Sequence, residues 1–170
     1  LGEPGVHVIH GTGRYFSDDY DPRGDTACLV ASQHLDEPAL ARYHCLEYIE
    51  DMGAAYAAAD LAICRSGAGT LAEIQHARLP AILVPKIGLP HEHQLANARD
   101  FEAARAALVV IEREQPGEPS IMHVPPAELA DSALSLLDDP RRLGSLARSL
   151  AQMQRPDTVD IVERTIASLV

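Results

Sequence analysis

The sequence predicts an α/β fold: a Rossmann-like, doubly wound parallel sheet with helices on both faces. Two observations predict it. Short apolar runs alternate with longer stretches whose apolar residues recur at helical spacing, which is typical of repeated strand–helix–strand units. One of these runs, AILV between Pro80 and Pro85, contains no polar residue, as an interior strand of a parallel sheet requires. A chain of 170 residues is long enough to bury one core of this kind.

The first part of the chain predicts a strand and several weaker elements. Residues 6–13 alternate β-branched residues with histidines and end in a glycine-bearing turn, which indicates a strand that runs into a loop. Residues 15–24 are rich in Asp and Gly and predict a loop. We expect a short strand or an inserted ribbon over residues 26–32. Residues 38–49 fit either a helix followed by a strand, or a strand over residues 43–49 alone.

The remainder of the chain predicts a regular alternation of helices and strands. Apolar spacing, alanine content and flanking prolines or acidic residues mark each element. We expect helices over residues 51–60, 69–78 and 93–106, strands over residues 61–66, 80–85 and 107–112, two helices within residues 125–154 that separate near Asp139 and Pro140, and a final amphipathic helix over residues 157–170.

Composition and charge exclude several classes of protein. The net charge of −11 comes from 25 acidic and 14 basic residues, which argues against broad contact with nucleic acid or with an anionic bilayer. No apolar run approaches about 20 residues, and the N-terminus lacks a basic and then apolar pattern, so a cytoplasmic protein is expected. Cys28, Cys45 and Cys64 show no CxxC spacing, which predicts reduced thiols rather than disulfides or a zinc site.

Two further motifs argue against a bound cofactor or metal. Residues 11–16, GTGRYF, hold the first two glycines of a dinucleotide fingerprint but place Phe16 at the third position, with no acidic residue that would close the unit. A nicotinamide cofactor is therefore not expected. His91 and His93 flank Glu92, yet a His-x-His pattern without further ligands is more typical of surface or sugar contact than of a metal site.

The stretch RSGAGT carries the clearest chemistry. A strand, a turn of small residues and a helix follow one another, so the backbone at Gly67, Ala68 and Gly69 can approach a phosphate at the amino end of the helix. We expect the helix to start near Thr70; alternatively, Thr70 only caps it and the glycines only turn the chain. Glu73, expected in the first turn, could accept hydrogen bonds from both ribose hydroxyls, or only favour the helix dipole.

Together these stretches resemble the carboxyl-terminal half of the MurG family, the peptidoglycan transferases that move N-acetylglucosamine from UDP onto lipid I. The motifs that carry the resemblance share their order and spacing with the family pattern: Tyr48 to Met52, Cys64 to Ala68 with Thr70 and Glu73, and Glu92 to Gln94 with Asn97 and Ala98.

The resemblance implies that this chain is the carboxyl-terminal half of a GT-B glycosyltransferase. Residues 1–150 would bind the nucleotide sugar, with the first strand of the family domain missing, and residues 151–170 would form a helix that packs on this domain or returns toward an absent acceptor domain. The implied reaction is metal-independent, inverting transfer from UDP-N-acetylglucosamine to a lipid-linked acceptor in cell-wall synthesis, at the inner face of the membrane.

The resemblance also implies a set of binding residues. The Ile49 backbone would read the uracil edge, Glu73 would hold the ribose, and Gln94 would bond the hexose hydroxyls. The set that would surround the UDP-sugar is Ile49, Arg65, Ser66, Gly67, Ala68, Gly69, Thr70, Glu73, His93, Gln94 and Asn97. For Arg65, packing against the sheet edge is the alternative.

Catalysis by these residues alone is not expected. The family's candidate general base belongs to the acceptor domain, and no residue of this chain is identified as a base within reach of an acceptor hydroxyl. Two alternatives stay open at this point: a nucleotide-sugar binding or regulatory module without catalysis, and a Rossmann-like domain with no ligand.

Overall fold

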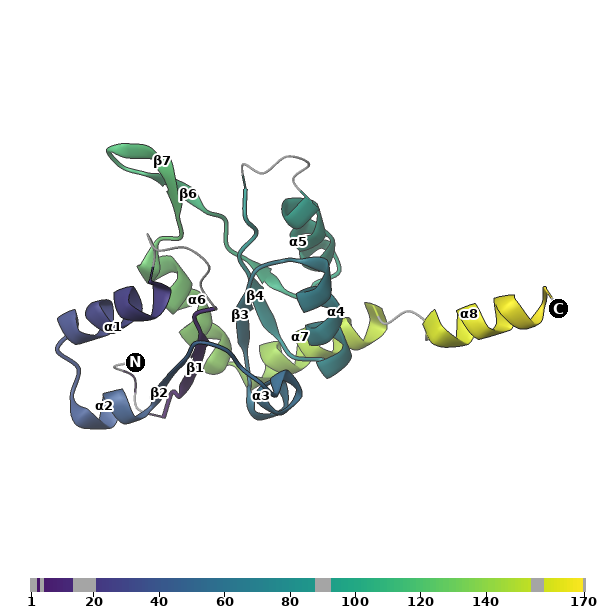
Figure 1. The fold of residues 1–170 in the computed structure, drawn as a ribbon, viewed down its shortest axis with the longest axis horizontal. Coiled ribbons are helices and arrows are strands. Elements are labelled where there is room, and N and C mark those ends of the chain that lie inside the picture. The colour runs from purple at the N-terminus through teal and green to yellow at the C-terminus, as the bar shows by residue number, and fades with distance from the viewer. Residues whose placement is uncertain (1–2, 4, 14–20, 88–92, 154–157, 170) are drawn as a thin grey trace. The chain divides into compact units, whose positions relative to one another are not determined.

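The structure is a computed structural model that describes residues 3, 5–13, 21–87, 93–153 and 158–169. The chain divides into two compact units, unit 1 over Leu1–Ala55 and unit 2 over Tyr56–Val170 (Figure 1). The domain boundaries predicted above, 1–150 and 151–170, stay a prediction.

Unit 1 holds a two-stranded parallel sheet. β1 (Val8–Gly11) pairs with β2 (Tyr43–Leu46), with Val8 opposite Tyr43 and Gly11 opposite Leu46. The helix α2 (Glu37–Ala41) precedes β2, so of the two alternatives for residues 38–49 the helix followed by a strand is the one observed. The strand expected over residues 6–13 is confirmed by β1.

The segment before α2 differs from its prediction. Residues 26–32, expected as a strand or ribbon, belong to the helix α1 (Pro22–Ser32). Its cap explains the difference: the Asp21 side chain accepts a hydrogen bond from the Gly24 amide at 2.9 Å, and Pro22 occupies the first helical position. The loop predicted over residues 15–24 lies mostly outside the described residues, and its end from Pro22 onward is helical.

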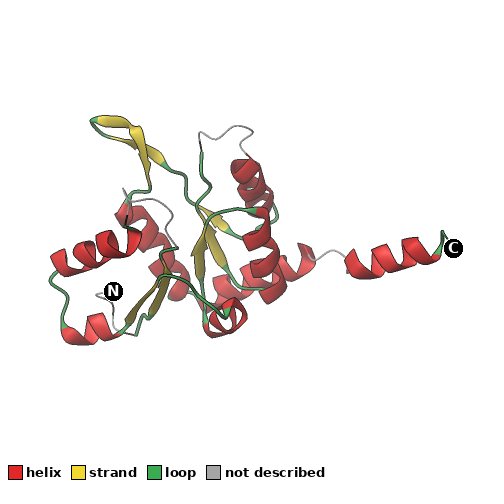
Figure 2. Cartoon of the chain, viewed as in Figure 1, coloured by secondary structure: helices red, strands yellow, loops and turns green. Residues whose placement is uncertain are grey.

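Unit 2 contains the predicted parallel sheet with its helices (Figure 2). Three parallel strands lie in the order β3, β4, β5, with Ile63 opposite Ile82 and Ile82 opposite Leu108. The bounds of the elements from the end of unit 1 onward are α3 (Met52–Ala58), β3 (Ala62–Cys64), α4 (Ala68–Ala77), β4 (Ala81–Leu83), α5 (His93–Ala103), β5 (Leu108–Val109), α6 (Pro126–Leu137), α7 (Pro140–Met153) and α8 (Thr158–Ala167).

The sheet of unit 2 is covered on both faces, which confirms a doubly wound α/β arrangement. Successive residues of β4 enter different core clusters: Leu83 packs in one with Ile74 of α4 and Phe101 of α5, and Ile82 packs in the other with Leu136 of α6. All three residues of β4 are fully buried. Because alternate residues of a strand point to opposite faces, both faces need apolar partners, and the unbroken apolar run supplies them.

A β-hairpin follows the parallel sheet and was not predicted. β6 (Arg113–Gln115) pairs antiparallel with β7 (Glu118–His123) around a turn at Pro116 and Gly117. Gly117 has φ +87, a left-handed conformation that glycine adopts at no steric cost. The Pro-Gly dipeptide is the sequence signal that indicates such a turn.

Candidate functional site

The carboxyl ends of the three parallel strands define the candidate site. β3 ends at Cys64, β4 at Leu83 and β5 at Val109, and these ends lie at one edge because the strands are parallel and in register. Open α/β sheets bind their ligands at this edge. Burial raises the pKa of the Cys64 thiol to about 11, so this thiol is protonated at neutral pH and is not a nucleophile there.

The amino end of α4 faces the loop that leaves β3. Gly67 is the N-cap, in an extended conformation with φ −68, and no side chain in the described part of the chain caps the helix. The Leu71 amide donates to the Gly67 carbonyl at 3.0 Å, so the amides of Ala68, Gly69 and Thr70 precede the first helical bond. An added Cβ at Gly67 or Gly69 would meet no atom within 4 Å. These amides therefore adjoin open space, as phosphate binding requires.

Two expectations for this helix are corrected by its starting point. α4 begins at Ala68, two residues before the expected start, so Thr70 is a first-turn residue and not the cap. Glu73 consequently lies in the second turn rather than the first. The early start follows from Gly67, whose extended backbone can serve as an N-cap without a side chain.

Glu73 is exposed and has a specific partner. Its Oε2 accepts a hydrogen bond from the Tyr56 hydroxyl at 2.8 Å. Partial burial, followed by the bond to Glu73, raises the pKa of Tyr56 well above its ordinary value of 10.0. The Tyr56 hydroxyl is therefore protonated at neutral pH, so it donates the hydrogen bond and the Glu73 carboxylate accepts it.

Ser66 and Asn97 tie the β3 loop to α5. The Ser66 side chain is fully buried, and its hydroxyl donates to the Gln94 carbonyl at 2.7 Å. The Asn97 side-chain amide donates to the Ser66 carbonyl at 3.1 Å. The structure brings these three predicted site residues together, and Ser66 and Asn97 position the neighbouring backbone.

Gln94 also holds the loop that follows β4. Its Oε1 accepts a hydrogen bond from the Lys86 amide at 3.0 Å, so one end of this side chain is engaged within the protein. Its NH₂ group carries the donors. His93 is exposed at the first position of α5. The predicted His-x-His motif lies partly outside the described residues, since His91 and Glu92 are not described.

Arg65 links the ends of β4 and β5. Its Nη1 lies 2.7 Å from Glu112 Oε1 and donates to the Val84 carbonyl at 3.2 Å. The Arg65 side chain is 48% exposed, whereas that of Glu112 is only 5% exposed. Glu112 Oε2 also accepts a bond from the Ile87 amide at 3.4 Å. Arg65 thus packs against the strand ends, as its alternative interpretation stated, while half of its guanidinium side chain faces solvent.

Ile49 is described within unit 1. It follows β2 and is half-buried beside Gly11, where an added Cβ would lie 3.4 Å from Ile49 Cδ1.

The described residues contain no group of three or more His, Cys, Asp or Glu side chains that could hold a metal ion.

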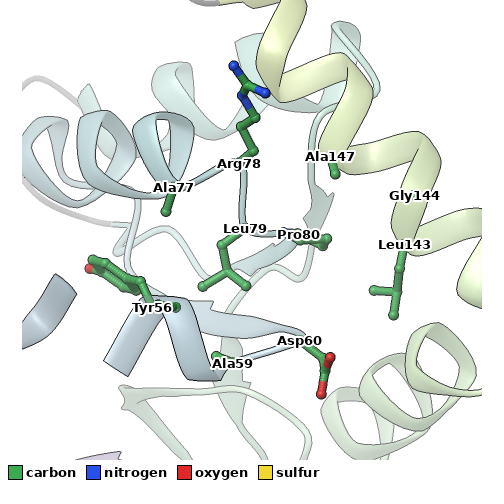
Figure 3. Close-up of a pocket in the computed structure, with 11 residues that line it drawn as sticks. Tyr56, Ala59, Asp60, Ala77, Arg78, Leu79, Pro80, Leu143, Gly144 and Ala147 are labelled. Atoms are coloured by element: carbon green, nitrogen blue, oxygen red, sulfur yellow. The ribbon is translucent and has the colours of Figure 1, made fainter. Parts of the chain in front are cut away.

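A surface hollow of about 350 Å³ lies at the other end of the strands in unit 2. Asp60, Leu79 and Pro80 line it, and these residues precede β3 and β4 rather than follow them. Figure 3 shows Leu143 and Ala147 of α7 along its other side. Because the hollow is remote from the carboxyl ends of the strands, it is not the candidate site.

Two residues of this site, Tyr56 and Glu112, are absent from the set predicted from the sequence. Tyr56 lies in an alanine-rich helix, where nothing in the sequence pairs it with Glu73. Glu112 did carry a signal: it is the acidic residue that directly follows the apolar run of β5, at the carboxyl end of a strand.

Comparisons with known proteins agree on one kind of relative. The profile of the glycosyltransferase family 28 C-terminal domain matches residues 4–157. The UDP-N-acetylglucosamine--N-acetylmuramyl-(pentapeptide) pyrophosphoryl-undecaprenol N-acetylglucosamine transferase of Salinibacter ruber is 35% identical over 169 residues, which cover 99% of this chain and 40% of that protein. The transferase of the same name from Alkalilimnicola ehrlichii is 43% identical over 141 residues, covering 83% of this chain and 37% of that protein.

A solved structure is similar as well. The crystal structure of Acinetobacter baumannii MurG superimposes with a TM-score of 0.64 and 27% identity, covering 96% of this chain and 42% of that one. The chain therefore spans about two fifths of the length of the relatives it matches.

Proposed function

This chain belongs to the glycosyltransferase family 28 C-terminal domain family, and on that premise we propose that it is the donor-binding part of a MurG-like transferase that uses UDP-N-acetylglucosamine. One observation carries the proposal: the uncapped amino end of α4, whose first amides adjoin open space at Gly67 and Gly69. Free amides and the helix dipole together favour a diphosphate at that place.

The ribose and the hexose are assigned to residues near this diphosphate site. Glu73 lies five residues beyond Ala68, which is roughly 7 to 8 Å along the axis of α4 and suits the span from a phosphate to a ribose. Its carboxylate accepts the ribose hydroxyls. The Gln94 side-chain NH₂ donates to the hexose hydroxyls, beside His93. For Ile49, which belongs to unit 1, the role at the uracil edge stays a prediction from the resemblance.

The proposed chemistry is displacement at the anomeric carbon with inversion. The acceptor hydroxyl oxygen bonds to C1 of the sugar, the bond from C1 to the β-phosphate oxygen breaks, and UDP leaves. The amides of Ala68, Gly69 and Thr70, with the half-exposed guanidinium of Arg65, stabilise the negative charge that develops on the diphosphate, which is the task a metal performs in other transferases. The base that takes the hydroxyl proton belongs to the acceptor domain of the longer protein.

The acceptor and the location rest on the relatives. Their name specifies an undecaprenol-linked acceptor, so we propose a lipid-linked acceptor, a role in peptidoglycan synthesis and peripheral attachment at the cytoplasmic face of the membrane. Within the described residues, no helix has the length and apolar character needed to cross a bilayer.

Calorimetric titration of the purified chain tests the donor. UDP-N-acetylglucosamine, UDP-glucose, UDP and GDP are compared, each with EDTA and with Mg²⁺. We expect uridine-selective binding that favours the acetamido sugar and is the same in EDTA. Glu73→Ala is expected to weaken UDP binding about 10-fold or more, because a charged acceptor of two hydrogen bonds is lost.

The matched control is Asp131→Ala, which removes an exposed carboxylate of α6. It is expected to bind UDP as the parent chain does. Equal affinity for UDP and GDP, or equal weakening by both substitutions, would contradict the proposal.

A further inference from the structure

The hydrogen bond between Tyr56 and Glu73 links a residue that packs against the core to an exposed carboxylate. It joins side chains from α3 and α4, and Glu73 is an exposed residue that makes no contribution to the core. Tyr56, by contrast, is half-buried and packs against the larger core cluster of unit 2. In Figure 3 its ring lies at one edge of the surface hollow, and the phenolic oxygen points away from Leu79 and Pro80.

The two partners differ in how firmly they are held. A glutamate on a helix surface has three side-chain torsions and loses much rotamer freedom when it is fixed. Tyr56 has two side-chain torsions, and the packing of its ring against the core cluster restricts them. The hydrogen bond from the Tyr56 hydroxyl therefore restricts the orientation of the Glu73 carboxylate before a ligand binds.

The geometry leaves the carboxylate able to bind. A carboxylate offers about four lone-pair positions, and the phenol occupies one on Oε2. As far as the described residues go, Oε1 and the second position on Oε2 are available for two hydroxyl donors. A vicinal diol supplies two such donors side by side.

We propose that Tyr56 is a positioning residue for nucleotide recognition: it holds the Glu73 carboxylate in the orientation that accepts the 2′- and 3′-hydroxyls of a uridine diphosphate. This inference rests on the proposed function. If it holds, Tyr56 strengthens binding only of ligands that carry both ribose hydroxyls, and contacts to the uracil and the diphosphate do not depend on it.

The test is Tyr56→Phe, which removes one oxygen and keeps the ring packed against the core cluster. Calorimetry compares UDP with 2′,3′-dideoxyuridine diphosphate on the parent chain, on Tyr56→Phe, on Glu73→Gln and on the double variant. We expect Tyr56→Phe to weaken UDP binding about 3- to 10-fold and to leave binding of the dideoxy ligand unchanged. In the Glu73→Gln background the same substitution is expected to have little further effect.

The matched control is Tyr43→Phe. It removes another tyrosine hydroxyl that makes a hydrogen bond, here with His10 Nδ1 at 2.6 Å in unit 1, and it is expected to bind UDP as the parent does. Both ligands are measured on one preparation of each variant, so a partly unfolded sample lowers the stoichiometry for both alike.

The outcomes separate the two proposals. If the parent and Glu73→Gln differ for UDP but Tyr56→Phe binds like the parent, or weakens both ligands equally, the role of Tyr56 is overturned while the donor site stands. If the folded parent chain binds no uridine nucleotide, the proposed function fails and the inference falls with it.

Discussion

A substitution at Gly69 is expected to have opposite effects on the stability of the fold and on UDP binding. It occupies the first turn of α4 and its missing side chain faces open space. Gly69→Ala is therefore expected to raise the free energy of unfolding by up to about 1 kcal/mol, because alanine loses less backbone entropy in a helix. The added methyl group would occupy the space proposed for the diphosphate, so we expect UDP affinity to fall about 10-fold or more. Urea unfolding and calorimetry measure the two effects.

The control for this prediction is Gly144→Ala in α7. An added Cβ there would lie 3.4 Å from Arg148 Nη1, the end of a flexible side chain that can move aside. A similar change in stability with unaltered UDP binding is expected. Parent-like UDP affinity in Gly69→Ala would show that no ligand group lies against the first turn of α4.

Single residues of the site were predictable where the signal is local in sequence. Gly67 and Gly69 stand in one short motif between a strand and a helix, and Glu73 follows within the same helix. Contacts between distant positions gave no such signal. Tyr56 and Glu73 are 17 positions apart, and their bond depends on how α3 lies against α4, which no local pattern specifies.

At the scale of elements, the pair of Arg65 and Glu112 joins the segments that follow β3 and β5, the strands on either side of β4, and its two members are not equivalent. Glu112 is buried and Arg65 is half-exposed. Arg65→Ala leaves a buried carboxylate without its cation and is expected to cost about 3 kcal/mol of unfolding free energy. Glu112→Gln leaves an arginine that water can solvate and keeps an acceptor, so about 1 to 2 kcal/mol is expected. Urea unfolding followed by circular dichroism measures both.

The pair Arg99 and Glu102 on the surface of α5 serves as the control. Both side chains are about half exposed, and Arg99→Ala is expected to cost less than about 0.5 kcal/mol. If Arg65→Ala is no more costly than Arg99→Ala, the link between the strand ends does not stabilise the fold.

The elements were predictable in proportion to the strength of their periodic pattern. β4 and α4 follow from an apolar run and from helical spacing, since burial on both faces leaves little freedom in sequence. Residues 28–30 are apolar and partly β-branched, a pattern that favours a strand, whereas Asp21 and Pro22 decide the helix α1 from its amino end. The β6–β7 hairpin was missed although its Pro-Gly turn is visible.

At the scale of the whole molecule, the fold class was predictable because alternation of strands and helices constrains topology strongly. The division into two compact units was not, since it depends on where contacts between distant segments are dense. The distribution of buried residues follows this division. Of the buried apolar residues in the described part of the chain, Ala39 alone belongs to unit 1.

This distribution predicts unequal local stability. Segments with few buried apolar contacts open at low free energy, whereas core strands and helices open only with global unfolding. We expect native-state hydrogen exchange to be slowest for amides of β4 and α4, whose residues Ile74 and Ile82 are fully buried, and several orders of magnitude faster for β1 and β2. Peptide-resolved mass spectrometry of the intact chain measures it. Equal protection of β1 and β4 would mean that the two units unfold as one cooperative body, and that the sparse core of unit 1 does not set its stability.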